Sequence, residues 1–350
     1  MALNTVSSDR LSTNVKTSNL GTELSKKVGQ NKNIIINGAM QVAQRGTSST
    51  SSGFQTVDRF KHSGSGWDAA LTQAQGSVSS GTTPYTEGFR KTFKLTNGNQ
   101  SSGAGAGDSL SMSCLIEDQD LATSGWNYLS TTNYVTLSFW FKSSVNQTFY
   151  VILESKDGTS RQYSFAITPT GADTWTKVTH TIPGNTGLQF SNDNGEGIEI
   201  YFAIFYGTNL TTSGHTLNTW KTTSSSDQAP DMTSTWFTTN NATFEITGVQ
   251  LEVGSVATDF EHRSVGQEFA LCCRYYQTNQ DFHHICVNNG ESDRYIRFPY
   301  EMRANPTVTT SPTNSVSFSA QSESTKGFAG NGSGASLANF NLTWTADAEL

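Results

Sequence analysis

Five aromatic side chains lie in polar stretches of the chain and are the residues best suited to binding chemistry. They are Trp67, Trp126, Tyr128, Trp220 and Trp236. The apolar face of a sugar ring stacks on an exposed indole or phenol, and neighbouring Asn, Asp and Gln side chains hydrogen-bond the sugar hydroxyls. The sequence therefore predicts these five as candidate glycan-binding residues, with half-buried packing as the alternative at each position. Trp140 and Trp175 lie inside strand-like runs and are expected in the core.

Two acidic stretches could serve other chemistry. Glu117-Asp-Gln-Asp120 directly follows an apolar stretch. Two carboxylates in an aromatic groove would suit glycoside hydrolysis, but a solvated turn at the end of a strand is the favoured interpretation. Asp193-Asn-Gly-Glu196 resembles part of a calcium loop and lacks the full ligand spacing. We therefore expect no cofactor, with a structural calcium left open.

Neither metal catalysis nor a nucleophile motif is indicated. His283 and His284 are the only adjacent histidines, and neighbours on a strand point to opposite faces, so no metal site is predicted. The many serines would allow a Ser-His-Asp triad, but the chain has no G-x-S-x-G elbow. The glycine-rich stretch 103–107 is not followed by the Lys-Ser/Thr pair of a phosphate loop. We expect a protein that is not an enzyme.

Composition narrows the class of partner. Only 15% of the 350 residues are charged and the net charge is -7, which gives no basic surface for nucleic acid. The longest apolar stretches are far shorter than the ~20 residues that cross a bilayer, so no membrane insertion is expected. The first residues lack the basic and apolar regions of a secretory signal, and four cysteines without a C-x-x-C pair suit free thiols in a reducing cytosol.

The elements that must position these residues are mostly strands. Apolar residues alternate with Ser and Thr from residue 32 onward, for example over 135–141, 149–153, 162–168, 175–182 and 198–205. No helix-length periodic segment interrupts residues 34–260, which favours an all-β fold: an antiparallel jelly-roll sandwich over 32–263. Two long polar insertions, 47–53 and 208–235, are expected to be functional or mobile.

The two ends of the chain differ from this body. Leu20, Leu24 and Val28 recur at a spacing of four and predict a short amphipathic helix within 1–31, which docks on a partner chain or on the body of the protein. Residues 264–350 are expected to form a compact bridge and a smaller C-terminal β domain. That domain has few large apolar side chains, so it is expected to need a neighbour, such as the same domain of another subunit.

Two passages carry a more specific signal. NIIINGAMQVAQRG at 33–46, with TVDRF at 56–60, and ITGVQLEVGSVATDFEHR at 246–263 resemble the opening and closing strands of a carbohydrate-binding-module-like jelly roll found in bacteriophage tail fibre and other virion structural proteins. LCCRYY at 271–276 and IRFPYEMRANP at 296–306 are similar to the bridge and C-terminal β unit of that family.

The resemblance implies a virion structural protein, a homotrimeric tail fibre or spike that binds host-surface glycan. Its partners would be its own copies, host polysaccharide, and other tail or adaptor proteins through the N-terminal segment. It would be located in the virion, in the tail or a surface appendage, after assembly in the host cytoplasm. A capsid or tail decoration protein with a purely structural role is the alternative, and a glycan hydrolase is less favoured.

Overall fold

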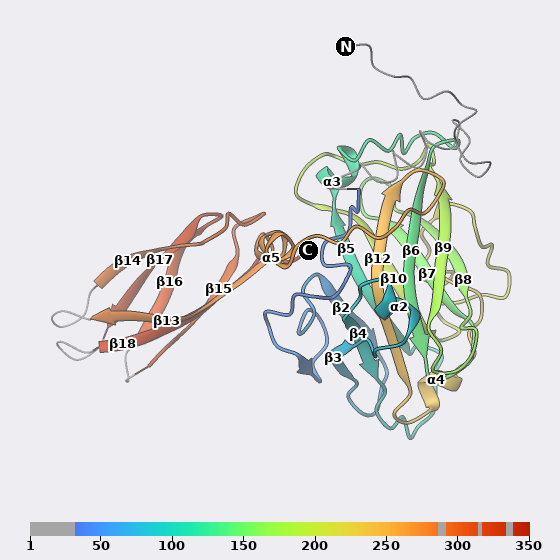
Figure 1. Ribbon diagram of the computed structural model, residues 1–350, viewed down its shortest axis with the longest axis horizontal. Coiled ribbons are helices and arrows are strands. Elements are labelled where there is room, and N and C mark those ends of the chain that lie inside the picture. Colours follow the sequence, from blue (N-terminus) through green and yellow to red (C-terminus); the bar gives the residue numbers. More distant parts are fainter. Residues whose placement is uncertain (1–31, 286–291, 314–316, 334–338) are drawn as a thin grey trace, which may run out of the picture.

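The computed structural model describes residues 32–285, 292–313, 317–333 and 339–350. The predicted helix with Leu20, Leu24 and Val28 lies outside these residues. Within them the chain is mostly strand, and the strands pair antiparallel throughout. The predicted all-β sandwich is confirmed. Figure 1 shows a large sandwich and a smaller C-terminal unit that meet beside one helix, α5.

Two six-stranded sheets form the sandwich. The first runs β1 (Ser48–Ser49), β3 (Thr72–Ser77), β4 (Lys91–Thr96), β12 (Thr243–Val253), β6 (Tyr134–Ser143) and β9 (Thr176–Pro183). The second runs β11 (Lys221–Thr222), β8 (Arg161–Ile167), β7 (Phe149–Ser155), β10 (Glu196–Tyr206), β5 (Ser109–Glu117) and β2 (Phe60–Ser65). Three short helices connect strands: α2 (Thr83–Thr86), α3 (Asp118–Ala122) and α4 (Thr235–Thr238).

Alternate side chains of each strand fill the space between the sheets. Phe139 of β6 meets Phe202 of β10 edge-on at 5.1 Å between ring centroids, and Phe149 of β7 meets Phe244 of β12 at 4.9 Å. All four rings are buried. Aromatic side chains bury large areas each, so a chain with 20 Phe closes a core despite its abundant Ser and Thr.

The two passages that carry the family resemblance lie side by side. The Ile34 N–H donates to the Leu251 carbonyl at 2.9 Å, and the Val249 N–H donates to the Gly38 carbonyl at 2.9 Å. A Cβ on Gly38 would lie 2.0 Å from the Val249 carbonyl oxygen, so this approach requires glycine. β12 itself lies between β4 and β6, the centre of the first sheet.

The insertion 208–235 packs against the second sheet. Leu210, Leu217 and Met232 contact a buried cluster on the outer face of β7 and β10 that includes Tyr150 and Ile152. Hydrogen bonds between β8 and this insertion add to the attachment. For example, the Gln162 side-chain amide of β8 donates to the Asp227 carbonyl of the insertion at 2.6 Å. The insertion therefore covers that face of the sandwich.

The C-terminal unit follows α5 (Val265–Cys273), a helix that lies in the expected bridge. Its sheets contain β13 (Tyr276–Ile285), β18 (Asn339–Asp347) and β15 (Thr307–Pro312) in one, and β14 (Ser292–Arg297), β17 (Gly327–Ser333) and β16 (Ser317–Ser324) in the other. α5 begins with a capping box between Ser264 and Gln267. A second, smaller core gathers around Phe298, Phe328 and Trp344.

Buried charges join the sandwich to the C-terminal unit. The Glu117 carboxylate accepts hydrogen bonds from Arg274 at 2.9 and 3.2 Å. Glu349 pairs with Arg59, and with Arg45 at 3.4 Å. The Arg59 guanidinium lies 3.4 Å from the centre of the Tyr275 ring. The expected solvated turn at 117–120 is wrong, because Glu117 and Asp118 are fully buried where α3 and the C-terminal unit cover the end of β5.

Candidate functional site

Three of the five predicted aromatic residues are buried. Trp236, Trp126 and Trp220 are 0%, 3% and 8% exposed and belong to the main core. Each indole N–H donates to a backbone carbonyl, for example from Trp220 to Pro183 at 2.7 Å. Their prediction as sugar platforms is wrong, because the polar loops that carry them fold back and seal the sandwich.

The other two retain partly exposed rings. Tyr128 packs edge-on against Phe190 at 4.6 Å, and Trp67 lies 6.1 Å from His62. Both are half-buried against the main core. Tyr128 also contacts the buried Trp126, at 6.3 Å between ring centroids. These two side chains remain candidates, with less free ring surface than an open platform.

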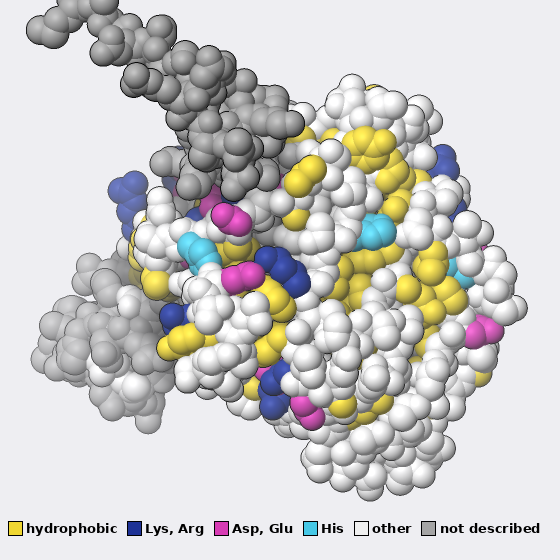
Figure 2. Space-filling view, turned by 45° about the vertical axis from the view of Figure 1, so that its right-hand side comes forward, with side chains coloured by type: hydrophobic (Ala, Val, Ile, Leu, Met, Phe, Trp, Pro, Cys, Tyr) yellow, Lys and Arg dark blue, Asp and Glu magenta, His cyan; other side chains and the backbone are white. Residues whose placement is uncertain are grey.

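A more open combination of rings and polar groups lies on the outer face of the first sheet. Trp140 and Trp175, expected in the main core, belong instead to a satellite cluster on this outer face. Next to them is a hollow of about 300 Å³ lined by Glu87, Lys177, Asp259, Phe260 and His262. Figure 2 shows acidic, basic and histidine side chains beside hydrophobic ones on one face of a surface that is otherwise mostly uncharged.

Local backbone structure brings this hollow together. β12 has an irregular register between Thr247 and Gln250, where Gly248 adopts φ +64°. A Cβ on Gly248 would lie 2.6 Å from the tip of the Phe89 ring, so glycine lets Phe89 approach β12 closely. Phe260, on the segment that follows β12, meets Phe89 edge-on at 4.9 Å. The irregular register of β12 thus positions the segments that carry Phe89 and Phe260.

Polar contacts fix the side chains of the hollow. The Trp140 indole N–H donates to Glu87 at 2.9 Å, and Lys177 pairs with the same carboxylate at 3.1 Å. The His262 Nε2 lies 2.8 Å from the Glu87 carbonyl oxygen. The Lys177 ammonium also lies 5.4 Å from the centre of the Trp140 ring, within range of a cation–π contact.

This arrangement can bind a small polar ligand with apolar faces. Glu87, Asp259 and His262 are exposed, so their oxygen and nitrogen atoms are available to hydroxyl groups. The Phe260 ring is half-buried and presents apolar surface beside them. A volume of about 300 Å³ is at the lower end for ligand sites and suits one or two sugar units better than a large cofactor.

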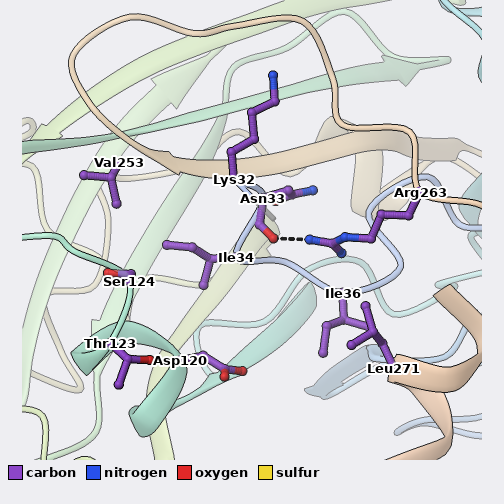
Figure 3. Close-up of a pocket in the computed structure, with 10 residues that line it drawn as sticks. All are labelled: Lys32, Asn33, Ile34, Ile36, Asp120, Thr123, Ser124, Val253, Arg263 and Leu271. Atoms are coloured by element: carbon purple, nitrogen blue, oxygen red, sulfur yellow. Dashed lines mark hydrogen bonds between the residues drawn. The ribbon is translucent and has the colours of Figure 1, made fainter. Parts of the chain in front are cut away.

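A second hollow of about 470 Å³ lies between residues 32–36, α3 and Arg263 (Figure 3). Its cations are already engaged. Arg263 donates to the backbone carbonyls of Asn33 and, at 3.2 Å, of Ile35, and Lys32 contacts Thr258 and the Asp259 carbonyl at 2.5 Å. The side chains that line it include no aromatic ring, so we read it as structural.

A Ser–His–Asp constellation is present under the insertion 208–235. The His215 Nε2 lies 2.5 Å from the Ser164 Oγ, and its Nδ1 lies 2.7 Å from the Asp227 Oδ1. Lys221 places its ammonium 2.9 Å from the same Nδ1 and 2.6 Å from the Asp227 Oδ2. Sequence reasoning missed this set because Ser164 lies in mid-strand, without an elbow motif.

The surroundings of this constellation do not suit a nucleophile. Ser164 is 1% exposed and the His215 side chain is fully buried. Two groups compete for Nδ1, because the Lys221 ammonium can only donate to it and the Asp227 carboxylate can only accept from it, so the set lacks the single orienting acceptor of a catalytic triad. We read the three residues as a clasp that holds the insertion on β8.

Other chemistry finds little support in the described ranges. Glu117 is fully enclosed and held by Arg274, so it is not an open acid for glycoside hydrolysis. In the part of the chain that the structure describes, no group of three or more His, Cys, Asp or Glu side chains is arranged to hold a metal. No helix among the same residues is long and apolar enough to cross a membrane.

No family model and no curated protein matches the chain. Similar solved structures include the enzymatically active domain of tailspike protein 4 from bacteriophage CBA120, with 14% identity, TM-score 0.36, and coverage of 64% of this chain and 22% of that one. Others are a putative sugar binding protein from Bacteroides thetaiotaomicron (11%, TM-score 0.32, 63% and 100% covered) and a family 11 carbohydrate-binding module from Clostridium thermocellum (12%, TM-score 0.28, 62% and 98% covered). All three TM-scores lie below 0.5, so these likenesses carry no weight for function here.

Proposed function

We propose that the protein is a non-enzymatic virion structural protein of a bacteriophage, a homotrimeric tail fibre or spike that binds host-surface glycan. The observation that carries glycan binding is the hollow in which Glu87, Lys177 and His262 surround apolar rings on the outer face of the first sheet. The virion role is supported by the resemblance of 33–46, 56–60 and 246–263 to bacteriophage tail fibre and other virion structural proteins. Several weak sites on linked subunits would raise avidity by about 10²–10⁴ without new contacts.

Glycan binding is tested with the purified full chain on an array of bacterial lipopolysaccharide and capsular polysaccharide. Wild type is compared with His262→Ala and Glu87→Gln, two residues that line the hollow, and with Thr179→Ala as a control on an exposed position of the same strand as Lys177. We expect retention of wild type and of the control on at least one polysaccharide, and a loss of about tenfold or more in both site variants. Equal retention of all four proteins would show that the glycan binds at another site.

A purely structural decoration protein is the alternative that this experiment also addresses. If wild type binds none of the polysaccharides or host cells, yet the chain co-sediments with phage particles, the protein decorates the virion without touching a receptor. In that outcome the hollow beside Trp140 has no ligand-binding role and results only from the packing of side chains on the outer face.

Absence of hydrolase activity is part of the proposal and has its own test. Among the residues that the structure describes, the hydrogen-bonded Ser164, His215 and Asp227 are the arrangement that favours an acyl hydrolase. We expect no labelling of the folded protein by a fluorophosphonate probe, because Ser164 is buried under the insertion. Labelling that Ser164→Ala abolishes would overturn this part.

A further inference from the structure

The hollow of about 470 Å³ in Figure 3 is bordered by aliphatic side chains from three parts of the fold. They are Ile34 and Ile36 near the start of the sandwich, Val253 at the end of β12, and Leu271 of α5. Val253 is 42% exposed, and the other three are partly exposed. Ile35, which lies between the two isoleucines, belongs instead to the main core. The outward side chains therefore offer apolar surface that a further apolar segment can cover.

Asp120 of α3 adds a carboxyl group to this hollow. Burial, followed by the charge of Glu117, raises the pKa of Asp120. Arg274 acts in the opposite direction, but it is held by Glu117. Arg59 also acts in the opposite direction and is held by Glu349. Within the described ranges, no Lys, Arg or His forms an ion pair with Asp120, so a cation that enters the hollow meets a carboxylate without a counter-ion.

The two cations that border the hollow are directed to other groups. Figure 3 shows Lys32 pointing away from Asp120, and the Lys32 ammonium lies 2.5 Å from the Thr258 hydroxyl. Arg263 pairs with Glu268 at 3.4 Å. The charges around the hollow therefore favour an occupant that has an apolar face and brings a cation of its own to Asp120.

The chain itself begins its described course at the edge of this hollow. Lys32 is the first described residue and borders the hollow, and 31 residues precede it. At up to about 3.5 Å per residue, the four steps from Lys32 back to Val28 span about 14 Å at most. Gly29 directly follows Val28, and glycine after a helix lets the chain reverse at low cost. The residues before Gly29 are therefore within reach of the hollow.

These residues have the side chains that the hollow requires. Leu20, Leu24 and Val28 fall on one face of a helix with 3.6 residues per turn. Lys27, three residues after Leu24, flanks this apolar face, whereas Lys26 falls on the opposite side. A helix this short is marginal in water, so it needs a surface that buries its apolar face.

We propose that residues 20–28 form a helix that docks in this hollow of the same chain. The apolar face of the helix covers the aliphatic side chains of the hollow, and the Lys27 ammonium pairs with Asp120. Because Leu271 belongs to α5, the docked helix contacts both the sandwich and the element that leads into the C-terminal unit. Docking on a partner chain, the other expected place for this helix, would leave the hollow open. The proposal does not depend on glycan binding.

Hydrogen exchange of the full chain, followed by mass spectrometry, tests the docking. We expect the amides of residues 24–28 to exchange about tenfold or more slowly than in a synthetic peptide of residues 16–31. Asp120→Lys should lose most of this protection, and the charge swap Asp120→Lys with Lys27→Asp should regain it. Asp173→Lys, the same change in an exposed turn, should keep it. Equal exchange in wild type and peptide, or protection that Asp120→Lys leaves unchanged, would overturn the proposal.

A disulfide trap shows whose segment fills the hollow. In a Cys286→Ser chain, whose other cysteines are buried, Val28→Cys with Val253→Cys should form an intrachain disulfide under mild oxidation, measured as the loss of two hydrogens. Val28→Cys with Tyr295→Cys, at an exposed position of β14, should not. A ¹⁵N-labelled Val28→Cys chain refolded with an unlabelled Val253→Cys chain should give no mixed disulfide. A mixed disulfide would assign the hollow to a neighbour's segment, and this result or the absence of the intrachain disulfide would overturn the proposal.

Discussion

At the scale of single residues, burial separates the tryptophans that hold the fold from those that can meet a ligand. Trp236 is fully enclosed beside Phe205 and Phe237, whereas Trp175 is half-exposed under the Lys142 ammonium, 5.1 Å from its ring centre. In the sequence Trp236 lies in a polar stretch and Trp175 in a strand-like run, which is the reverse of their burial in the fold. Their substitution should therefore affect different properties of the molecule.

The first prediction follows from this difference. Trp236→Ala should lower the free energy of unfolding by about 3–5 kcal/mol, because it leaves a large cavity in the core. Trp175→Ala should cost about 1–2 kcal/mol and leave the fold intact. Urea unfolding followed by circular dichroism measures both. Similar losses for the two variants would contradict the assignment of Trp175 to an open face.

A second prediction concerns His62, which is buried in the sandwich with its Nδ1 unpartnered. Burial lowers the pKa of His62 to about 4 from an ordinary value of 6.5. Below pH 6.5 the unfolded chain binds a proton that the folded chain does not take up, so stability falls as the pH drops from 6.5 towards 4. The loss reaches about 3 kcal/mol at pH 4.

His62→Phe removes this titration and provides the measurement. Urea midpoints of wild type and variant between pH 4 and 7.5 should diverge towards acid, with the wild type losing more. Asp58 and Asp118 have raised pKa values, each to about 6, and they oppose the trend equally in both proteins. Parallel pH curves would show that His62 is protonated in the folded state.

At the scale of elements, the junction between β5, α3 and α5 depends on Glu117. Burial alone would raise the pKa of Glu117, but hydrogen bonds from Arg274 and Tyr275 overcome this and lower it. The charged pair lies between an element of the sandwich and one that leads into the C-terminal unit. Because Arg274 is over a third exposed, the pair contributes less than one enclosed on both sides.

Glu117→Ala should loosen this junction. We expect a loss of about 2–4 kcal/mol, since Arg274 and Arg303 lose their shared partner, and a separate early unfolding step of the C-terminal unit. Differential scanning calorimetry tests this against Glu154→Ala, whose side chain is half-exposed on β7. A single unchanged transition in the Glu117 variant would show that other contacts hold the two parts together.

At the scale of the whole molecule, the C-terminal unit has a thin core and several exposed rings. Phe269 of α5 and Tyr300 contact each other at 6.3 Å and are both exposed, as is Tyr295. Apolar side chains in such positions suit contact with another subunit. If the protein is a homotrimer, light scattering during gel filtration should give three times the chain mass of 37.9 kDa. A monomer mass at micromolar concentration would contradict the trimer.

The sequence by itself determined the all-β class, because alternation of apolar and polar residues reports a strand whatever its partners. It also identified 33–46 and 246–263 as the passages that carry the family resemblance. In the structure these two passages pair through Asn33, Gly38 and Leu251. The acidic stretches at 117–120 and 193–196 were visible as well, but one sequence could not tell that the Gln119 N–H would bond the Asp193 carbonyl at 2.9 Å.

Only the tertiary structure decided which aromatic rings are exposed. Trp126, Trp220 and Trp236 have polar neighbours, yet loops fold over the ends of the sandwich and bury them, while Trp140 and Trp175 alternate like core residues and lie on the outer face. Alternation along a strand distinguishes two faces but does not say which one meets the opposite sheet. That choice depends on strand order and on which loops cover which face, and both are set by contacts between residues far apart in the chain.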